Sequence, residues 1–257
     1  MIRPSGLISS SFEYHSNPRI GYDNLFVGAT LSADGSDEDN AFDGLTYDYW
    51  TAEDYGGTIT ATLTSGRECN YFGVAGHDLH LVSGTVALEY FDYATMAWVE
   101  LAAFAPGSAS PMMATFDRVG SDRYRVVVTG GATIAVLSAG VYLEMERGSY
   151  GGFAPPRFAR STRLLNNGAQ NGQFLGRSVV RQGWSGTLNL EDLSNGWVRT
   201  HLDPFLSHAR ESAWFLQWDA TEHPNEAAYC WTSDEPRITN QSGVYMSTSL
   251  SVEGIGP

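Results

Sequence analysis

Two stretches of the first half, residues 85–91 (TVALEYF) and 123–129 (RYRVVVT), decide the fold class. In both, apolar and polar side chains alternate with a period of two, which is typical of a β-strand with one buried face. Residues 58–63 (TITATL), 71–76 (YFGVAG) and 141–145 (VYLEM) are further predicted strands, separated by clusters of Gly, Pro, Ser or Asp. Because no stretch of this half shows a sustained helical period, it is predicted to be an antiparallel β-sandwich.

The densest Gly/Pro segment of the chain, residues 148–156 (GSYGGFAPP), follows this predicted sandwich. Gly and Pro mark turns and linkers, so we place a domain boundary there. The first domain is then residues 1–147 and the second is residues 148–257. Few contacts are expected to cross such a junction. The sequence leaves open whether residues 1–19 pair with strands of the second domain.

The second half is again mainly β-strand, and one amphipathic helix interrupts it. The predicted strands are residues 176–182, 184–190, 214–218, 227–231 and 243–252. One buried helical face is formed by Val198, Leu202, Phe205, Leu206 and Ala209. The whole chain is therefore predicted to be all-β, with one or two short helices.

The ends of this helix carry their own signals. Ser194 or Asn195 precedes the apolar face, and either residue type is suited to cap a helix start. Pro204 lies inside the run and lacks a backbone N–H. The segment is therefore expected to form either one helix or two short ones, with Asp203 capping the second.

Charge and composition exclude nucleic acid as an expected partner. The chain has 257 residues and a net charge of −14, from 29 Asp and Glu against 15 basic residues, all of which are Arg. An acidic protein without Lys is poorly suited to bind phosphate backbones. Arg forms planar, multidentate hydrogen bonds, so an Arg-only set favours protein–protein contacts, although a bias in genome composition would produce the same set.

The sequence offers no membrane or export signal. No apolar run approaches the about 20 residues that cross a bilayer. The first residues, MIRPSGLISSSFEYHSN, contain no stretch of signal-peptide type. We therefore expect a protein made and kept in a cytoplasm, without membrane insertion. Cys69 and Cys230 lie one in each predicted domain and are expected to be buried free thiols.

Residues 36–50 (SDEDNAFDGLTYDYW) carry the clearest motif of the first domain, formed by Asn40, Ala41, Asp43, Gly44 and Trp50. The motif resembles the N-A-x-D-G-x-x-x-x-x-W signature of discoidin-like and galactose-binding jelly rolls. Residues 70–79, 97–99 and 141–145 resemble the following elements of that family, in the same order. The resemblance covers residues 20–147 and implies a galactose-binding-like jelly roll, in which the Asp-Gly pair makes a tight turn.

Many members of that family bind sugars through loops at one rim. The resemblance implies a glycan site formed by Tyr47, Trp50, His77 and Asp78. Aromatic faces stack on the apolar side of a sugar ring, while a carboxylate and an imidazole bond its hydroxyls. In the alternative interpretation, Trp50 belongs to the core and His77-Asp78 forms a turn whose side chains bond backbone groups.

No residues point to a metal ion, a cofactor or catalysis. Acidic residues crowd the loop 34–43, which suggests a calcium site. The resemblance argues against calcium, because calcium-binding members of the family place an Asp just after the Asp-Gly pair and a Glu near the final strand. This chain has Leu45 at the first position and Ala139-Gly140 near the second. His77 and His80 lie three apart on a predicted strand-to-turn segment, so they point to opposite faces instead of sharing a zinc ion. The chain has no HExxH motif, protease-like Cys–His pattern or phosphate-binding loop. The protein is therefore expected not to be an enzyme.

The second half has an ordered set of segments, namely residues 150–162, 171–177, 197–209 and 214–218, followed by Pro224, Tyr229 and Trp231. The set resembles tail proteins of long-tailed phages, prophages and gene transfer agents, over residues 148–255. This resemblance implies a tail-tube-like β-sandwich or split barrel used in rings at the distal end of the tail. Five Trp residues crowd this half, and we expect three of them in its core.

Together these patterns predict a structural protein of a phage tail tip or baseplate, in a virion assembled in the host cytoplasm. The second domain would form a homo-oligomeric ring that contacts tail tube, hub and baseplate proteins. The jelly roll would face outward, where it could bind a host glycan. The alternative is a carbohydrate-binding protein or host-glycan adhesin. A glycan hydrolase needs paired carboxylates, and the sequence singles out no such pair.

Overall fold

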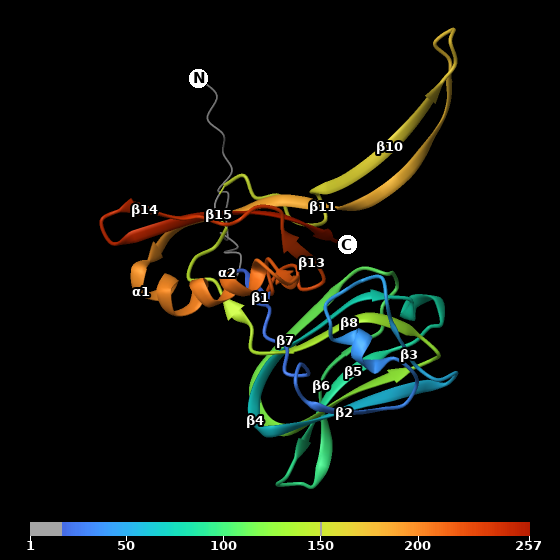
Figure 1. Cartoon of the computed structure of the whole chain (residues 1–257), viewed down its shortest axis with the longest axis vertical. Coiled ribbons are helices and arrows are strands. Elements are labelled where there is room, and N and C mark those ends of the chain that lie inside the picture. Colours follow the sequence, from blue (N-terminus) through green and yellow to red (C-terminus); the bar gives the residue numbers. More distant parts are fainter. Residues whose placement is uncertain (1–16, 150) are drawn as a thin grey trace, which may run out of the picture.

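A computed structural model of the chain describes residues 17–149 and 151–257 (Figure 1). The described chain is mostly β-strand, as the sequence predicts, and one short helical segment interrupts its second half. Residues 30–140 form a seven-stranded sheet, and the other strands form an eight-stranded sheet. Figure 1 shows the two sheets as separate bodies that meet near β1 and β7.

The seven-stranded sheet folds back on itself into a sandwich of the jelly-roll type, because two of its strands are long and bent. β4 (Gly56–His77) pairs with β7 (Met112–Thr129), with irregularities between Thr62 and Arg67 and between Cys69 and Tyr71. The first half of β4 also pairs with β2, and the second half with β8. Each long strand thus passes from one layer to the other, as corner strands do. The remaining elements are β2 (Thr30–Ala33), η1 (Glu38–Ala41), β3 (Trp50–Thr51), η2 (Leu79–Leu81), β5 (Val86–Asp92), β6 (Ala97–Phe104) and β8 (Thr133–Gly140).

Apolar side chains from both layers fill this sandwich. Tyr124, Val126 and Val128 point inward from β7, which confirms the alternation of residues 123–129. Trp50 and Phe72 are fully buried in the same cluster. The predicted strands 58–63 and 71–76 are one continuous strand, since the bent β4 also includes the polar residues between them.

The eight-stranded sheet has the order β10-β11-β15-β13-β12-β1-β9, and β14 pairs with β15. A continuous helical segment lies along one of its faces and buries the predicted apolar residues there. Trp184, Trp214 and Trp218 are buried, as expected for three of the five Trp residues. The elements are β1 (Arg19–Gly21), β9 (Leu143–Glu144), β10 (Arg160–Gly168), β11 (Phe174–Ser194), α1 (Asn195–Trp197), η3 (Val198–Leu202), α2 (Asp203–Ala209), β12 (Trp214–Gln217), β13 (Ala227–Thr232), β14 (Ile238–Ser242) and β15 (Tyr245–Ile255).

The start of the helical segment is as predicted, and its middle differs. Ser194 Oγ accepts a hydrogen bond from the backbone N–H of Trp197 at 3.4 Å, so Ser194 is the cap. Asp203 has helical backbone angles, and its side chain does not cap α2. Instead of ending the helix, Pro204 follows a π-helical turn at η3. A wider turn before Pro204 accommodates the residue that has no N–H to donate.

The sandwich is inserted into the second sheet. β1 lies between β12 and β9 in the eight-stranded sheet, and every strand of the sandwich lies between β1 and β9 in sequence. Arg19 therefore pairs with the second half, whereas residues 1–16 lie outside the described residues. The chain returns to the second sheet between Gly140 and Leu143. This crossing lies a few residues before the Gly/Pro segment at which the sequence places the boundary.

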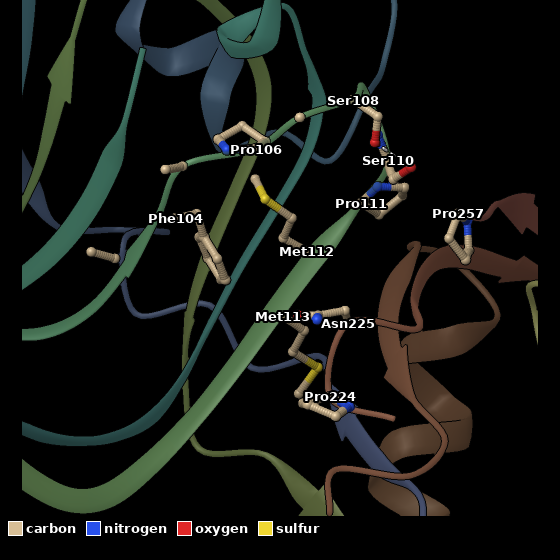
Figure 2. Close-up of a pocket in the computed structure, with 13 residues that line it drawn as sticks. Phe104, Pro106, Ser108, Ser110, Pro111, Met112, Met113, Pro224, Asn225 and Pro257 are labelled. Atoms are coloured by element: carbon tan, nitrogen blue, oxygen red, sulfur yellow. Dashed lines mark hydrogen bonds between the residues drawn. The ribbon is translucent and has the colours of Figure 1, made fainter. Parts of the chain in front are cut away.

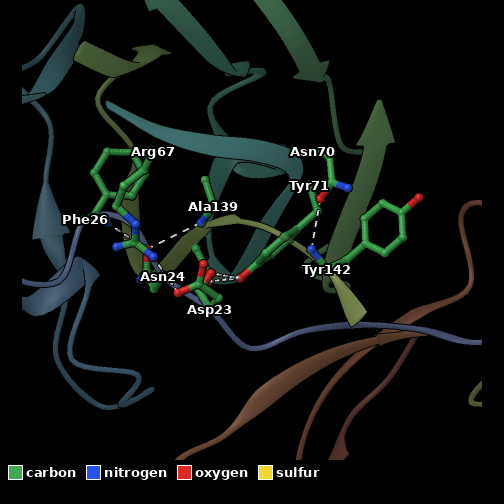
Figure 3. Close-up of polar contacts among 9 residues, drawn as sticks. Asp23, Asn24, Phe26, Arg67, Asn70, Tyr71, Ala139 and Tyr142 are labelled. Atoms are coloured by element: carbon green, nitrogen blue, oxygen red, sulfur yellow. Dashed lines mark hydrogen bonds and ion pairs between the residues drawn. The ribbon is translucent and has the colours of Figure 1, made fainter. Parts of the chain in front are cut away.

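Both connections between the halves are held by polar contacts (Figure 3). The hydroxyl of the buried Tyr71 donates to the backbone oxygen of Asp23 at 2.6 Å. The carboxylate of Asp23 accepts from Arg67, also at 2.6 Å. On the returning connection, the backbone N–H of Tyr142 donates to Asn70 Oδ1 at 2.9 Å. The two crossing segments are therefore fixed to the sandwich by side chains of β4.

A third apolar cluster joins the halves, contrary to the expectation that few contacts cross the junction. Phe215 lies so close to Gly73 that a Cβ at position 73 would be 2.8 Å from its ring. The hydroxyl of Tyr229 donates to the backbone oxygen of Gly44 at 2.6 Å. The Gly/Pro segment follows the crossing between Gly140 and Leu143 and does not form it. The cluster consists of Tyr71, Ala75, Met113, Ala135 and Val136 from the sandwich and Phe215, Ala227 and Tyr229 from the second sheet.

Both cysteines are buried free thiols, as predicted. Burial raises the pKa of the Cys69 thiol to about 12, so it is protonated at neutral pH. Among the described residues, no helix has the length and apolar character needed to span a membrane.

Candidate functional site

Strand β8 brings the predicted site residues to one end of the sandwich. Trp50 pairs with Ile134 from one side, and His77 pairs with the same residue from the other. The backbone oxygen of Tyr55 accepts from the N–H of Gly130 at 3.2 Å. The loops 44–56, 77–84 and 129–133 therefore share one end of the sandwich, which we call the rim.

Trp50 is part of the core, which corrects its proposed role in sugar stacking. The side chain is fully buried, and its indole N–H donates to the backbone oxygen of Asp34 at 3.2 Å. A sugar ring has no access to a buried indole face. Trp50 instead closes the sandwich below the rim.

Asp78 and His77 also have structural contacts. Asp78 Oδ1 accepts the backbone N–H of Thr133 at 2.7 Å, so this side chain holds the turn. His77 Nε2 lies 3.2 Å from the backbone oxygen of Ser110. Burial lowers the pKa of His77 below its ordinary value, so the imidazole is neutral at neutral pH. The turn interpretation of these two residues describes their contacts better than the sugar-binding one.

The exposed aromatic residues of the rim are tyrosines. Tyr47 keeps 74% of its surface exposed, and Tyr55 keeps 96%. Sequence reasoning identified Tyr47 and missed Tyr55. Tyr55 sits in a turn in which the backbone N–H of Gly56 donates to the oxygen of Glu53 at 2.9 Å. The signal that could have revealed it is the Glu53-Asp54-Tyr55-Gly56 run, because an aromatic residue inside a polar turn cannot reach the core.

Two acidic residues precede Tyr55 in the same turn. Glu53, Asp54, Tyr55 and Gly56 line a shallow depression in the surface. Carboxylate oxygens accept hydrogen bonds from hydroxyl groups, and the face of a tyrosine ring packs against apolar C–H groups. This pairing of an exposed ring with hydrogen-bond acceptors fits a sugar.

One carboxylate of the acidic loop that precedes the rim holds a turn. Asp43 Oδ1 accepts the backbone N–H of Leu45 at 2.8 Å, and Gly44 has a φ of 80°. The Asp-Gly pair therefore makes the tight turn that the resemblance implies. Within residues 17–149 and 151–257, no group of three or more His, Cys, Asp or Glu residues is placed to hold a metal ion.

A larger cavity, of about 530 Å³, lies at the junction of the two halves (Figure 2). Its walls are the loop between β6 and β7, the start of β7, and segments of the second half around Pro224 and Pro257. The lining side chains are apolar or small and polar, and none of them is titratable. Its lining side chains include no carboxylate or imidazole and no exposed aromatic ring, so it is a weaker candidate for sugar binding than the rim.

The first half of the chain thus belongs to the class of jelly-roll β-sandwiches, and solved structures of similar shape include carbohydrate-binding modules. One is a module from Clostridium perfringens in complex with GalNAc-β-1,3-galactose, at 17% identity and a TM-score of 0.38, covering 46% of this chain and all of the module. A chitosan-binding module from a Paenibacillus chitosanase/glucanase has 18% identity and a TM-score of 0.39, covering 46% of this chain and 98% of the module.

A third similar structure belongs to an enzyme chain. It is a Ruminococcus gnavus fucosidase mutant in complex with fucose, at 16% identity and a TM-score of 0.39. The match covers 48% of this chain but only 27% of the fucosidase. No model of a known protein family matches this sequence, and no curated protein matches it. The comparisons give no support to the resemblance between the second half and tail proteins, which stays a prediction.

Proposed function

We propose that this protein binds carbohydrate, and that the jelly roll does so at the rim. The observation that carries the proposal is Tyr55, whose ring is almost fully exposed in a depression lined by two carboxylates. A protein gains nothing in stability from an uncovered aromatic ring, because burial is what makes such a ring stabilising. An uncovered ring beside hydrogen-bond acceptors is free to stack on a ligand, and this supports the proposal.

The charge of the rim defines the class of glycan. Asp48, Glu53 and Asp54 lie on the same loops as Tyr47 and Tyr55. Carboxylates repel an acidic sugar and tolerate a neutral or amine-bearing one. The preferred ligand is therefore a neutral or amino sugar, with Tyr55 stacking on the ring and Glu53 and Asp54 accepting from its hydroxyl or amino groups.

Calorimetric titration of the full chain tests this proposal. We expect binding of GalNAc-β-1,3-galactose or a chitosan oligosaccharide, and no binding of an oligomannuronate, whose carboxylates would face those of the rim. Tyr55→Ala should weaken binding about 10-fold or more, which corresponds to about 1.4 kcal/mol. Tyr93→Ala is the matched control, because Tyr93 is 53% exposed and lies beyond the far end of β5. Equal affinity of the two variants would exclude Tyr55 as the stacking residue.

A second candidate function is that of a structural subunit of a phage tail tip, as the sequence predicts. The observation that favours it is the insertion of the sandwich into a second sheet with a long projecting hairpin, β10–β11 (Figure 1). A free sugar-binding module needs no such hairpin. In this role the chain would be part of a virion, contact tail tube, hub or baseplate proteins, and display the jelly roll to host glycans. Detection of the chain in purified phage particles by mass spectrometry would support this role, and its absence from every particle made by the host strain would exclude it.

A further inference from the structure

The β10–β11 hairpin extends beyond the body of the second sheet (Figure 1). β10 pairs with β11 over Phe174–Trp184, and β15 pairs only with the later part of β11, from Trp184 onward. Every residue of β10 is exposed. The outer part of the hairpin is therefore a two-stranded ribbon, which is marginally stable in water unless something packs against it.

Both faces of this ribbon carry large apolar side chains. Successive residues of a strand point to opposite faces. Leu164 and Leu165 are exposed neighbours on β10 and so lie on opposite faces, and Val179, which pairs with Leu164, is exposed on the same face as Leu164. Phe174, Leu175 and Val180 are also exposed, at or beside the two register shifts of the hairpin. Strands that are apolar on both faces are usually covered on both faces, so the ribbon has the composition of a buried element.

The ribbon is also the basic part of an acidic protein. Residues 148–190 contain five Arg and no Asp or Glu, whereas the chain as a whole has 29 acidic residues and a net charge of −14. Arg160, Arg163 and Arg177 are exposed on the ribbon. The surface that best complements a basic ribbon is acidic, and the remainder of this same chain is acidic.

The end of the second sheet away from the hairpin is formed by β14 and the start of β15 (Figure 1). There β14 is an edge strand, and Val244 and Tyr245 are exposed beside its turn. Glu191 lies in the adjoining irregularity of β11, and Asp234 is exposed shortly before β14. This end thus combines an unpaired strand edge, apolar side chains and carboxylates.

We propose that the β10–β11 ribbon of one copy packs against the β14 end of a second copy. The two surfaces differ, so the contact is heterologous, and its repetition gives a closed ring or an open filament. The ribbon would lie between neighbouring copies, which covers both of its faces and its free edge. The proposal does not depend on sugar binding, because the rim belongs to the other sheet.

Sedimentation velocity of the full chain at micromolar concentration tests the proposal. We expect oligomers that dissociate as salt is raised, since the contact includes charge pairs. The combined change Arg160→Glu, Arg163→Glu and Arg177→Glu should weaken association about 100-fold or more, and Leu175→Ser about 10-fold. Leu81→Ser is the matched control, because Leu81 is as exposed as Leu175, at 74% against 65%, but lies at the rim of the sandwich. All these side chains are exposed, so the variants should keep the circular dichroism spectrum of the parent.

A charge exchange identifies the receiving surface. Glu191→Arg with Asp234→Arg should also prevent association, and mixing this variant with the hairpin variant should restore it, because each reversed surface then meets a complementary one. A parent chain that stays monomeric at every concentration would overturn the proposal. So would a hairpin variant that associates like the parent, or a parent whose ribbon arginines bind nucleic acid instead of a second copy.

Discussion

Replacement of Phe215 by Ala tests whether the two halves of the chain fold as one unit. Phe215 is 1% exposed, its ring centroid lies 4.8 Å from that of Tyr229, and its edge contacts Gly73 of the sandwich. Truncation removes the transfer free energy of the ring and leaves a cavity, which together cost about 3–5 kcal/mol. A chain of this size loses about 2–4 °C in Tm per kcal/mol, so we expect a decrease of about 6–20 °C.

Differential scanning calorimetry is the appropriate assay. Because the third apolar cluster is shared, the parent should unfold in one transition, and the variant should lower that transition as a whole. Phe158→Ala is the matched control, since Phe158 is 74% exposed and its truncation should cost no more than about 0.5 kcal/mol. Two separate transitions in the parent, with only one of them moved by Phe215→Ala, would refute the shared core.

Three further predictions concern single side chains. Trp50→Ala should lower the free energy of unfolding by about 3–5 kcal/mol in urea melts, because the indole is fully buried; a nearly neutral effect would contradict its place in the core. Tyr229→Phe should cost about 1 kcal/mol in the same assay, through loss of the hydrogen bond to Gly44, and an unchanged stability would show that this bond is not important. Burial holds the pKa of His77 below 6.5 in the folded protein, so the unfolded chain binds more protons in that window and stability should fall as the pH drops through 6.5. Urea melts at about pH 7.5 and about pH 5.5 should show a smaller decrease for His77→Gln than for the parent, and an equal decrease would exclude His77 as a cause.

The sequence predicted the parts of the fold that repeat a local pattern. The alternation of residues 123–129 places Tyr124, Val126 and Val128 in the core, and the structure confirms it. Ser194 caps the helical segment as expected, because capping needs only a side-chain oxygen next to the first turn.

Features that depend on distant parts of the chain were not predictable in this way. β1 and β9 have three and two residues, too few to show a period, so the insertion of the sandwich could not be inferred. The bend of β4 looks like a loop in the sequence, because polar residues occupy the corner between its two layers. Burial across the junction depends on the contact between the Phe215 ring and Gly73. The local sequence around either residue carries no signal for this contact.

The four residues predicted for the sugar site lie near one end of the sandwich but differ in exposure and contacts, and sugar binding there stays a prediction. Tyr47 is exposed at the rim, whereas Trp50 is buried beneath it, since the same aromatic type suits a core and a sugar platform. Asp78 bonds a backbone N–H, a role that its presence in a turn also suggests. Tyr55 was missed although it lies in the polar run of residues 53–56, and its exposure of 96% separates it from the core tyrosines.

The most direct test of sugar binding at the rim is an NMR titration of the full chain with GalNAc-β-1,3-galactose and with a chitosan oligosaccharide. We expect saturable shifts of backbone amide signals for Glu53, Asp54, Tyr55 and Gly56, with smaller shifts near Tyr47. Signals around Tyr93, beyond the far end of β5, should not move. Saturable shifts centred on the junction cavity around Met113 and Pro224 would move the binding site away from the rim, and no shift with any neutral or amino sugar would contradict the proposed function.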